Sequence, residues 1–127
     1  MKYISTRGGG APQKFSGILL EGLAPDGGLY VPESFPKADL AGWRGLSYPD
    51  LACAILSQFM DDIPDLEKIV KATYTREIFG SDDITPLKTL EPGFHLLGLS
   101  NGPTLAFKDI ALQLLGRLLE SVLEKKK

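Results

Sequence analysis

Cysteine, histidine and tryptophan each occur only once in this chain of 127 residues, and its uninterrupted apolar runs are only a few residues long. The single cysteine, Cys53, excludes a disulfide within one chain and is typical of a reducing compartment. Short apolar runs argue against a membrane-spanning helix. The first residues also lack the apolar stretch of a signal peptide. We therefore expect a cytoplasmic protein that does not bind a membrane.

The chain has little net charge, because 14 basic and 16 acidic residues leave a formal charge of −2. Without an excess of positive charge there is no electrostatic field that would attract nucleic acid. Apolar residues make up 43% of the chain and charged residues 24%, which is close to the averages of folded soluble proteins. This composition argues against disorder, and the length allows one modest hydrophobic core.

The first third of the chain predicts two short strands and a helix. Residues 3–6 and 29–32 favour extended structure, and the turn-forming residues 24–28 precede the second of these segments. Ser16 is a candidate helix cap before a short apolar face. A small strand pair with one short helix is therefore expected here.

Residues 33–80 are expected to be mostly helical. Ser47 is a candidate N-cap, and Asp50 follows at the capping-box spacing. After the stop signal at residues 61–64, apolar residues recur at helical spacing on one face, namely Leu66, Ile69 and Val70. This pattern predicts a helical layer that covers a core.

The last third of the chain predicts two strands, a polar loop and a long helix. Residues 85–90 and 94–99 favour strands, and the turn residues 91–93 separate them. The loop at 100–104 contains two helix breakers, and residues 105–127 are expected to be helical. The apolar arc of this helix is wide, so it requires cover on more than one side.

Known phosphate and metal motifs are absent. Residues 8–13 lack the third glycine of a dinucleotide-binding loop, and residues 102–109 lack the Gly-Lys-Ser/Thr ending of a Walker A loop. His95 and Cys53 lie far apart in the sequence, so we expect no metal site and place His95 in the core. Adjacent aspartates do not face each other on a helix, so the two Asp-Asp pairs are expected to be caps or solvated turns.

Lys108 is a candidate nucleophile, because it follows a polar loop and lies in the first turn of the expected helix. A cation there opposes the helix dipole at a cost of about 0.3–1 kcal/mol. This field and partial burial together favour the neutral amine that attacks a carbonyl carbon. Phe107 and Ile110 would help to exclude water. Local physics leaves open the alternative of a surface lysine that reaches solvent from a helix end.

The segment from Ser100 to Asp109, SNGPTLAFKD, resembles the lysine motif of threonine synthases, which are fold-type II pyridoxal-phosphate (PLP) enzymes. Residues 3–8 (YISTRG), 20–32 (LEGLAPDGGLYVP) and 84–87 (ITPL) resemble the same family. The order and spacing of these segments also match, so the resemblance covers nearly the whole chain. The Asp-Gly-Gly segment favours threonine synthase over a relative such as threonine dehydratase.

The resemblance implies a cofactor, a substrate and a set of site residues. Lys108 would hold pyridoxal 5'-phosphate as a Schiff base and, once freed, would move protons at the α and β carbons of O-phospho-L-homoserine. Phosphate would leave from the γ carbon, and water would add at the β carbon to give L-threonine. Asn101 and Thr104 would contact the cofactor or substrate, with Thr104 equally a candidate helix cap. Phe107 and Asp109 would shape the surroundings of the lysine, Asp109 by accepting from backbone donors.

The resemblance also implies the domain organisation of a mixed α/β fold. A small helix-rich amino-terminal domain with short strands would span residues 1–83. Residues 84–127 would form the first strand–loop–helix of the PLP-binding domain. The enzymes of this family are several times longer than this chain, and the sequence lacks their loops for the substrate carboxylate and the cofactor phosphate. We therefore expect an amino-terminal piece of a threonine synthase that is inactive by itself.

Two alternative functions remain open. One is a non-catalytic α/β interaction module that retains the lysine motif and binds another protein. The other is a small phosphate-binding protein that uses the helix start near Leu105, although no glycine loop is dedicated to a phosphate. A reading frame that continues into a Ser-Gly-Asp-Thr-Gly-like segment would favour the enzyme over the interaction module. If the last helix lacks cover, its apolar arc is also expected to cause self-association.

Overall fold

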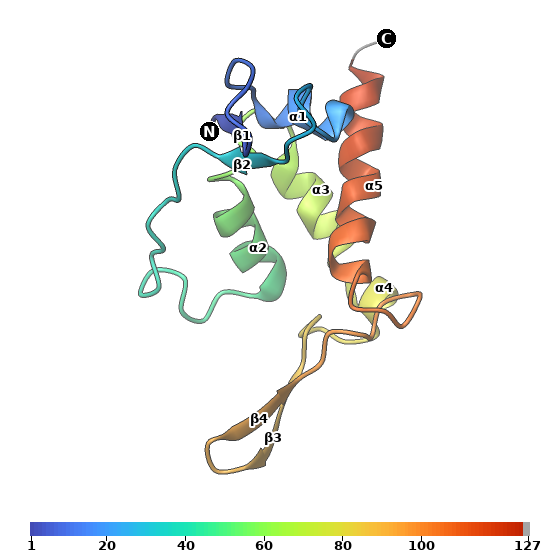
Figure 1. Ribbon diagram of the computed structural model, residues 1–127. Helices are drawn as coiled ribbons and strands as arrows, with labels where there is room; N and C mark the ends of the chain where they lie inside the picture. Colours follow the sequence, from blue (N-terminus) through green and yellow to red (C-terminus); the bar gives the residue numbers. More distant parts are fainter. Residues whose placement is uncertain (126–127) are drawn as a thin grey trace.

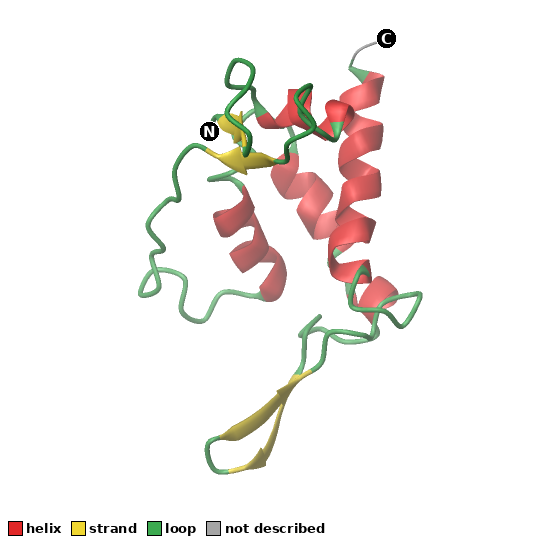
Figure 2. Ribbon diagram, viewed as in Figure 1, coloured by secondary structure: helices red, strands yellow, loops and turns green. Residues whose placement is uncertain are grey.

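The computed structural model describes residues 1–125 and has a mixed α/β fold of helices around one core with two small strand pairs (Figures 1 and 2). The expected helical end of residues 126–127 lies outside the described residues. The elements, in chain order, are β1 (Tyr3–Ser5), α1 (Phe15–Glu21), β2 (Tyr30–Pro32), α2 (Tyr48–Leu56), α3 (Leu66–Thr73), α4 (Arg76–Phe79), β3 (Leu87–Glu91), β4 (Phe94–Leu97) and α5 (Asp109–Glu124).

The core lies where α3 and α4 meet the long helix α5 (Figure 1). It follows the helical spacing expected for α3, since Leu66 and Val70 are buried and Ile69 packs beside them. Helix α5 contributes every fourth residue to the same core, namely Leu114, Leu118 and Val122. Because this row packs against α3, the core fixes the direction of α5 and the place where it begins.

Strands β1 and β2 pair in antiparallel fashion, with Tyr3 opposite Pro32 and Ser5 opposite Tyr30. The Asp26 carboxylate joins the loop after β1 to the turn before β2. It accepts hydrogen bonds from Ser5 Oγ at 2.7 Å and from the backbone N–H groups of Gly9 and Gly28, each at 2.9 Å. These bonds, with that from Ser5 the largest effect, hold the pKa of Asp26 below its ordinary value. The expected turn at residues 24–28 is thus confirmed.

The start of α2 is confirmed and the start of α1 is not. Ser47 is the N-cap of α2, and its Oγ accepts from the Asp50 N–H at 3.3 Å and donates to Asp50 Oδ2 at 2.6 Å. Helix α1 begins at Phe15 with Lys14 as its N-cap residue, so Ser16 lies within the helix. The Ser16 N–H instead donates to Asp62 Oδ2 at 3.1 Å, which joins α1 to the segment between α2 and α3.

Strands β3 and β4 form the expected hairpin, which projects away from the helices (Figure 1). All of its residues are exposed, so the placement of His95 in the core is wrong. The His95 Nδ1 atom lies 3.0 Å from Thr89 Oγ1 on the neighbouring strand. An apolar strand was expected to be buried, but no other described element covers this hairpin.

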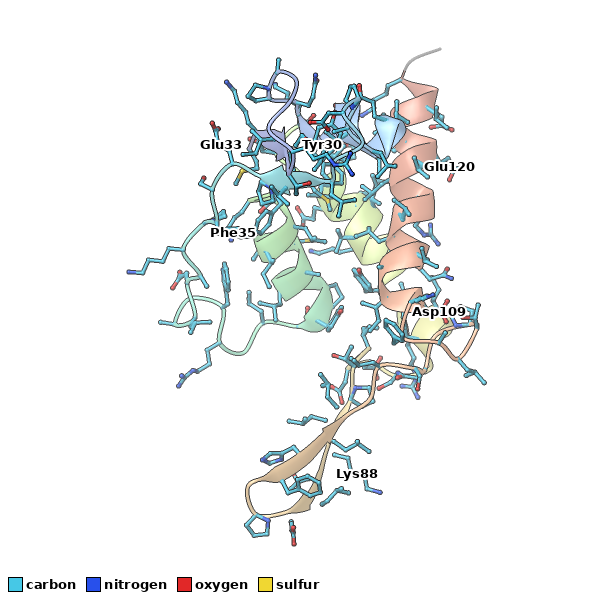
Figure 3. All side chains as sticks on the ribbon, in the orientation of Figure 1. Tyr30, Glu33, Phe35, Lys88, Asp109 and Glu120 are labelled. Atoms are coloured by element: carbon cyan, nitrogen blue, oxygen red, sulfur yellow. The ribbon has the colours of Figure 1, made fainter. Side chains whose placement is uncertain are left out.

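Phe79 and Phe35 provide a matched test of where the core lies. Phe79 is 1% exposed at the end of α4, whereas Phe35 is 79% exposed on the loop before α2 (Figure 3). We expect Phe79→Ala to lower the free energy of unfolding by about 3–5 kcal/mol, because it leaves a cavity. Phe35→Ala should change it by less than about 0.5 kcal/mol. Urea denaturation measures both, and similar losses in the two variants would contradict this placement.

Candidate functional site

Lys108 lies immediately before α5, as the N-cap residue of that helix. The expected helix start at Leu105 is wrong, because Leu105 has a φ of 57° in the left-handed region. A non-glycine residue in that region costs about 1–2 kcal/mol, so the surrounding contacts must hold it there. Residues 105–108 are a structured turn, and the helix begins only at Asp109.

The carboxylate of Asp109 holds this turn closed. The side chain is 2% exposed, and its Oδ2 accepts from both the N–H and the Oγ1 of Thr104, each at 2.8 Å. Its Oδ1 accepts from Gln113 Nε2 at 3.3 Å, one turn further along α5. The expectation that Asp109 accepts from backbone donors near the helix start is confirmed. Thr104 lies outside the helix and is not its N-cap.

Asn101 anchors the beginning of the same loop. Its Nδ2 donates to the carbonyl oxygens of Ile84 at 2.8 Å and Phe79 at 3.1 Å. The loop that carries Lys108 is therefore fixed at one end by Asn101 and at the other end by Asp109. Sequence patterns did not reveal these bonds, because they join the loop after the β3–β4 hairpin to residues that precede the hairpin in the sequence.

Gly102 is needed for the closure of the loop. A Cβ atom built on Gly102 would lie 2.7 Å from Asp109 Oδ2 and would also overlap with the Asp109 Cβ. No side chain fits there unless Asp109 moves. The Gly-Pro pair in the sequence indicated a turn, but nothing in the sequence indicated which residue packs against this glycine.

The loop presents the Lys108 side chain to solvent. Lys108 is exposed, and its ammonium group forms no ion pair or hydrogen bond with any of residues 1–125. The expected partial burial is thus wrong. Phe107 is 65% exposed and does not dry the site as expected, whereas Ile110 packs against the core. The chain therefore offers an accessible primary amine on a loop whose backbone is held by the hydrogen bonds of Asn101 and Asp109.

A cavity elsewhere in the molecule is a possible alternative site. A cavity of about 690 Å³ lies between α2 and the loop before it, and its lining includes Trp43 and Phe59. It contains no residue of the Lys108 loop. Within residues 1–125, no three His, Cys, Asp or Glu side chains gather where they could hold a metal ion. No helix in that part of the chain has the length and apolar character needed to cross a membrane.

A family sequence model described as "Threonine synthase N terminus" matches residues 2–74, which is more than half of the chain. The chain belongs to the threonine synthase family. The loop that carries Lys108 lies outside the matched residues, so this match defines the family but not the site.

Individual threonine synthases are similar over almost the entire chain. A threonine synthase of Methylobacillus glycogenes is 55% identical over 99% of this chain, and one of Corynebacterium glutamicum is 48% identical over the same share. A crystal structure of PLP-bound threonine synthase from Brucella melitensis superposes with a TM-score of 0.93 at 42% identity and covers 99% of this chain. The chain spans only 28–29% of the length of these proteins.

The loop from Asn101 to Asp109 fits one of the contacts that PLP requires. PLP carries an aldehyde, which forms a covalent bond with an accessible lysine amine. Lys108 is exposed and has no competing carboxylate partner among the described residues. Thr104 Oγ1, while donating to Asp109, keeps lone pairs that can accept a hydrogen bond. The donor set therefore suits the aldehyde end of the cofactor.

The Asp109 carboxyl group makes the stability of the fold depend on pH. Burial raises the pKa of its carboxyl, but hydrogen bonds from Thr104 and Gln113 outweigh burial, so the pKa lies below its ordinary value. A carboxyl whose pKa is lower in the folded state stabilises the fold above the unfolded-state pKa. This contribution is lost as the pH falls through the folded-state pKa.

We expect Asp109→Asn to unfold at a lower temperature than the unchanged chain at neutral pH. The difference should narrow at about pH 3, which lies below the ordinary pKa of an aspartate, because the unfolded chain takes up a proton there and the charged carboxylate contributes less to stability. Thermal unfolding followed by circular dichroism at both pH values tests this expectation. An equally large difference at both pH values would contradict the role of the charged carboxylate.

Proposed function

We propose that this chain is the amino-terminal part of a threonine synthase, and that Lys108 is the residue that holds PLP. The reaction converts O-phospho-L-homoserine and water to L-threonine and phosphate. One observation carries the proposal: in a member of this family, an exposed lysine amine lies on a loop that partly buried side-chain hydrogen bonds hold at both ends. The PLP-bound neighbour with a TM-score of 0.93 supports the choice of cofactor.

The proposed roles of the loop residues follow from the polar atoms that their hydrogen bonds leave available. The Lys108 amine binds the cofactor covalently and, when released, moves protons at the α and β carbons of the substrate. The bound cofactor supplies an electron sink for these steps. Thr104 contacts cofactor or substrate through the lone pairs that remain on Oγ1. Asn101 does so through Oδ1, because its Nδ2 donates to backbone carbonyl oxygens.

Residues 84–127 are proposed to begin the PLP-binding domain, and residues 1–83 to form the amino-terminal domain. The β4 strand, the loop and α5 supply the strand–loop–helix order that this division requires. A phosphate cradle and a partner for the pyridine nitrogen would come from other parts of the protein. Because catalysis depends on such preorganised groups, we propose that this chain alone is inactive. The cytoplasmic location also stays a prediction.

A second candidate function is a non-catalytic module that binds another protein. It is favoured by the exposed apolar side chains of the hairpin, namely Leu87, Leu90, Phe94, Leu96 and Leu97. Exposed apolar patches of this kind mark interaction surfaces. The enzyme proposal explains the same surface, since the chain spans less than a third of its relatives. Labelling of Lys108 by PLP separates the two functions.

Covalent trapping on the full-length protein tests the assignment of Lys108. PLP is added, borohydride reduces the adduct, and peptide mapping locates the label. We expect the label on Lys108, and we expect Lys108→Ala to abolish threonine formation without unfolding the protein. Lys88 is an exposed lysine on the hairpin (Figure 3), so Lys88→Ala serves as the matched control and should remain active. Label on another lysine, or no label, would overturn the assignment.

Self-association of the isolated chain is proposed to occur through the uncovered face of α5. Leu112 on α5 is 53% exposed, and Leu115, three residues further along, is 38% exposed and lines an apolar groove of about 330 Å³ between α1, α2 and α5. We expect analytical ultracentrifugation to detect a dimer whose population falls in Leu112→Glu. Leu40→Glu changes a 76% exposed leucine on a distant loop and should leave the dimer unchanged. A strict monomer at all concentrations would contradict the proposal.

A further inference from the structure

The loop that carries Lys108 is held in a conformation that its own backbone does not favour. Leu105 lies in the left-handed region at a φ of 57° and is exposed, so no packing of its side chain stabilises this conformation. Such a residue persists only where surrounding contacts determine the backbone. Its own N–H donates to the Gly102 carbonyl at 3.0 Å, and the next contacts along the chain are those of Thr104 with Asp109.

The Asp109 carboxylate accepts three hydrogen bonds in the first turn of α5. Its Oδ2 receives the backbone N–H and the hydroxyl of Thr104, and its Oδ1 receives Gln113 Nε2. A hydrogen bond to an ionised acceptor is stronger than one between neutral groups. The backbone also closes the turn, since the Asp109 N–H donates to the Ala106 carbonyl at 3.0 Å. Residues 104–109 therefore form one closed unit.

Lys108 lies between Thr104 and Asp109 in the sequence, so its backbone belongs to this unit. Its carbonyl accepts from the N–H groups of Ala111 at 3.1 Å and Leu112 at 2.8 Å, which joins it to α5. The direction in which the side chain leaves the backbone is therefore determined jointly by the helix and by the Asp109–Thr104 bonds. Gly102 permits this closure, because a side chain there would displace the carboxylate.

We propose that Asp109 is a positioning residue for Lys108, and that Gly102 is a second such residue because it leaves room for the Asp109 carboxylate. Neither residue reacts with cofactor or substrate. Together they hold the lysine amine at the place from which it reaches the aldehyde of PLP and the substrate carbons. This inference rests on the proposed function of Lys108. Because small misplacements of a reacting group reduce rates strongly, by about a hundredfold for a 1 Å shift, the effect is measurable.

The test uses the full-length protein with limiting PLP and compares how much label borohydride fixes on Lys108 and on Lys88. In Asp109→Ala and in Gly102→Ala, we expect the ratio of Lys108 to Lys88 label to fall by about tenfold or more. Under saturating cofactor, kcat should fall by a similar factor, while KM changes by less than about twofold. Asp109→Asn retains one oxygen acceptor and should recover most of both quantities.

Gly116→Ala is the matched control for the glycine substitution. Gly116 lies within α5, and nothing lies within 4 Å of a Cβ atom built on it. The labelling ratio and kcat should therefore stay as in the unchanged protein. Circular dichroism checks folding, and if Asp109→Ala fails to fold, then Gly102→Ala decides the outcome.

The experiment distinguishes a failure of the proposed function from a failure of the positioning role. If the unchanged protein is not labelled on Lys108, the proposed function fails. If it is labelled there but folded Asp109→Ala and Gly102→Ala keep both the labelling ratio and kcat, the positioning role is overturned. A loss of stability without a change in ratio or kcat also overturns it, because Asp109 would then be structural only.

Discussion

Packing between α3 and α5 is the interaction on which the rest of the structure depends. Val70 and Thr73 on α3 are fully buried, and Leu118 on α5 lies in the same core. Tyr74 adds a hydrogen bond from its hydroxyl to the Ile110 carbonyl at 2.9 Å, close to the start of α5. These contacts fix the first turn of α5 in space. Local hydrogen bonds between Thr104 and Asp109 then hold the backbone from which the Lys108 side chain extends.

Sequence patterns predicted the elements that local chemistry determines. Ser47 is an N-cap as expected, because its hydroxyl needs only an N–H three residues away. The start of α5 was placed four residues too early, because apolar spacing continues through Leu105 and does not report the left-handed φ of that residue. His95 was misplaced for a related reason. An apolar strand pattern indicates burial but cannot indicate whether a covering layer exists.

The candidate site was predictable in its residues but not in its geometry. Lys108 and Asp109 were identified from the sequence, the first through local physics and a family resemblance and the second through its helix-start position. The closure of Asp109 onto Thr104 and the space at Gly102 are local, but they depend on the backbone conformation of the loop, which apolar periodicity does not encode. The hydrogen bond from Asn101 to the Ile84 carbonyl depends on how the β3–β4 hairpin returns the chain to the segment after α4. The family and the PLP-bound structural neighbour supply the chemical context for this geometry.

A crystal structure of the full-length protein after reaction with PLP and borohydride would show whether Lys108 holds the cofactor and whether Asp109 positions it. We expect continuous electron density from Lys108 Nζ to the cofactor. We also expect Asp109 Oδ2 to remain hydrogen-bonded to the N–H and the hydroxyl of Thr104, as it is here at 2.8 Å. Density that joins the cofactor to another lysine would contradict the account, as would a loop in which Asp109 has left Thr104.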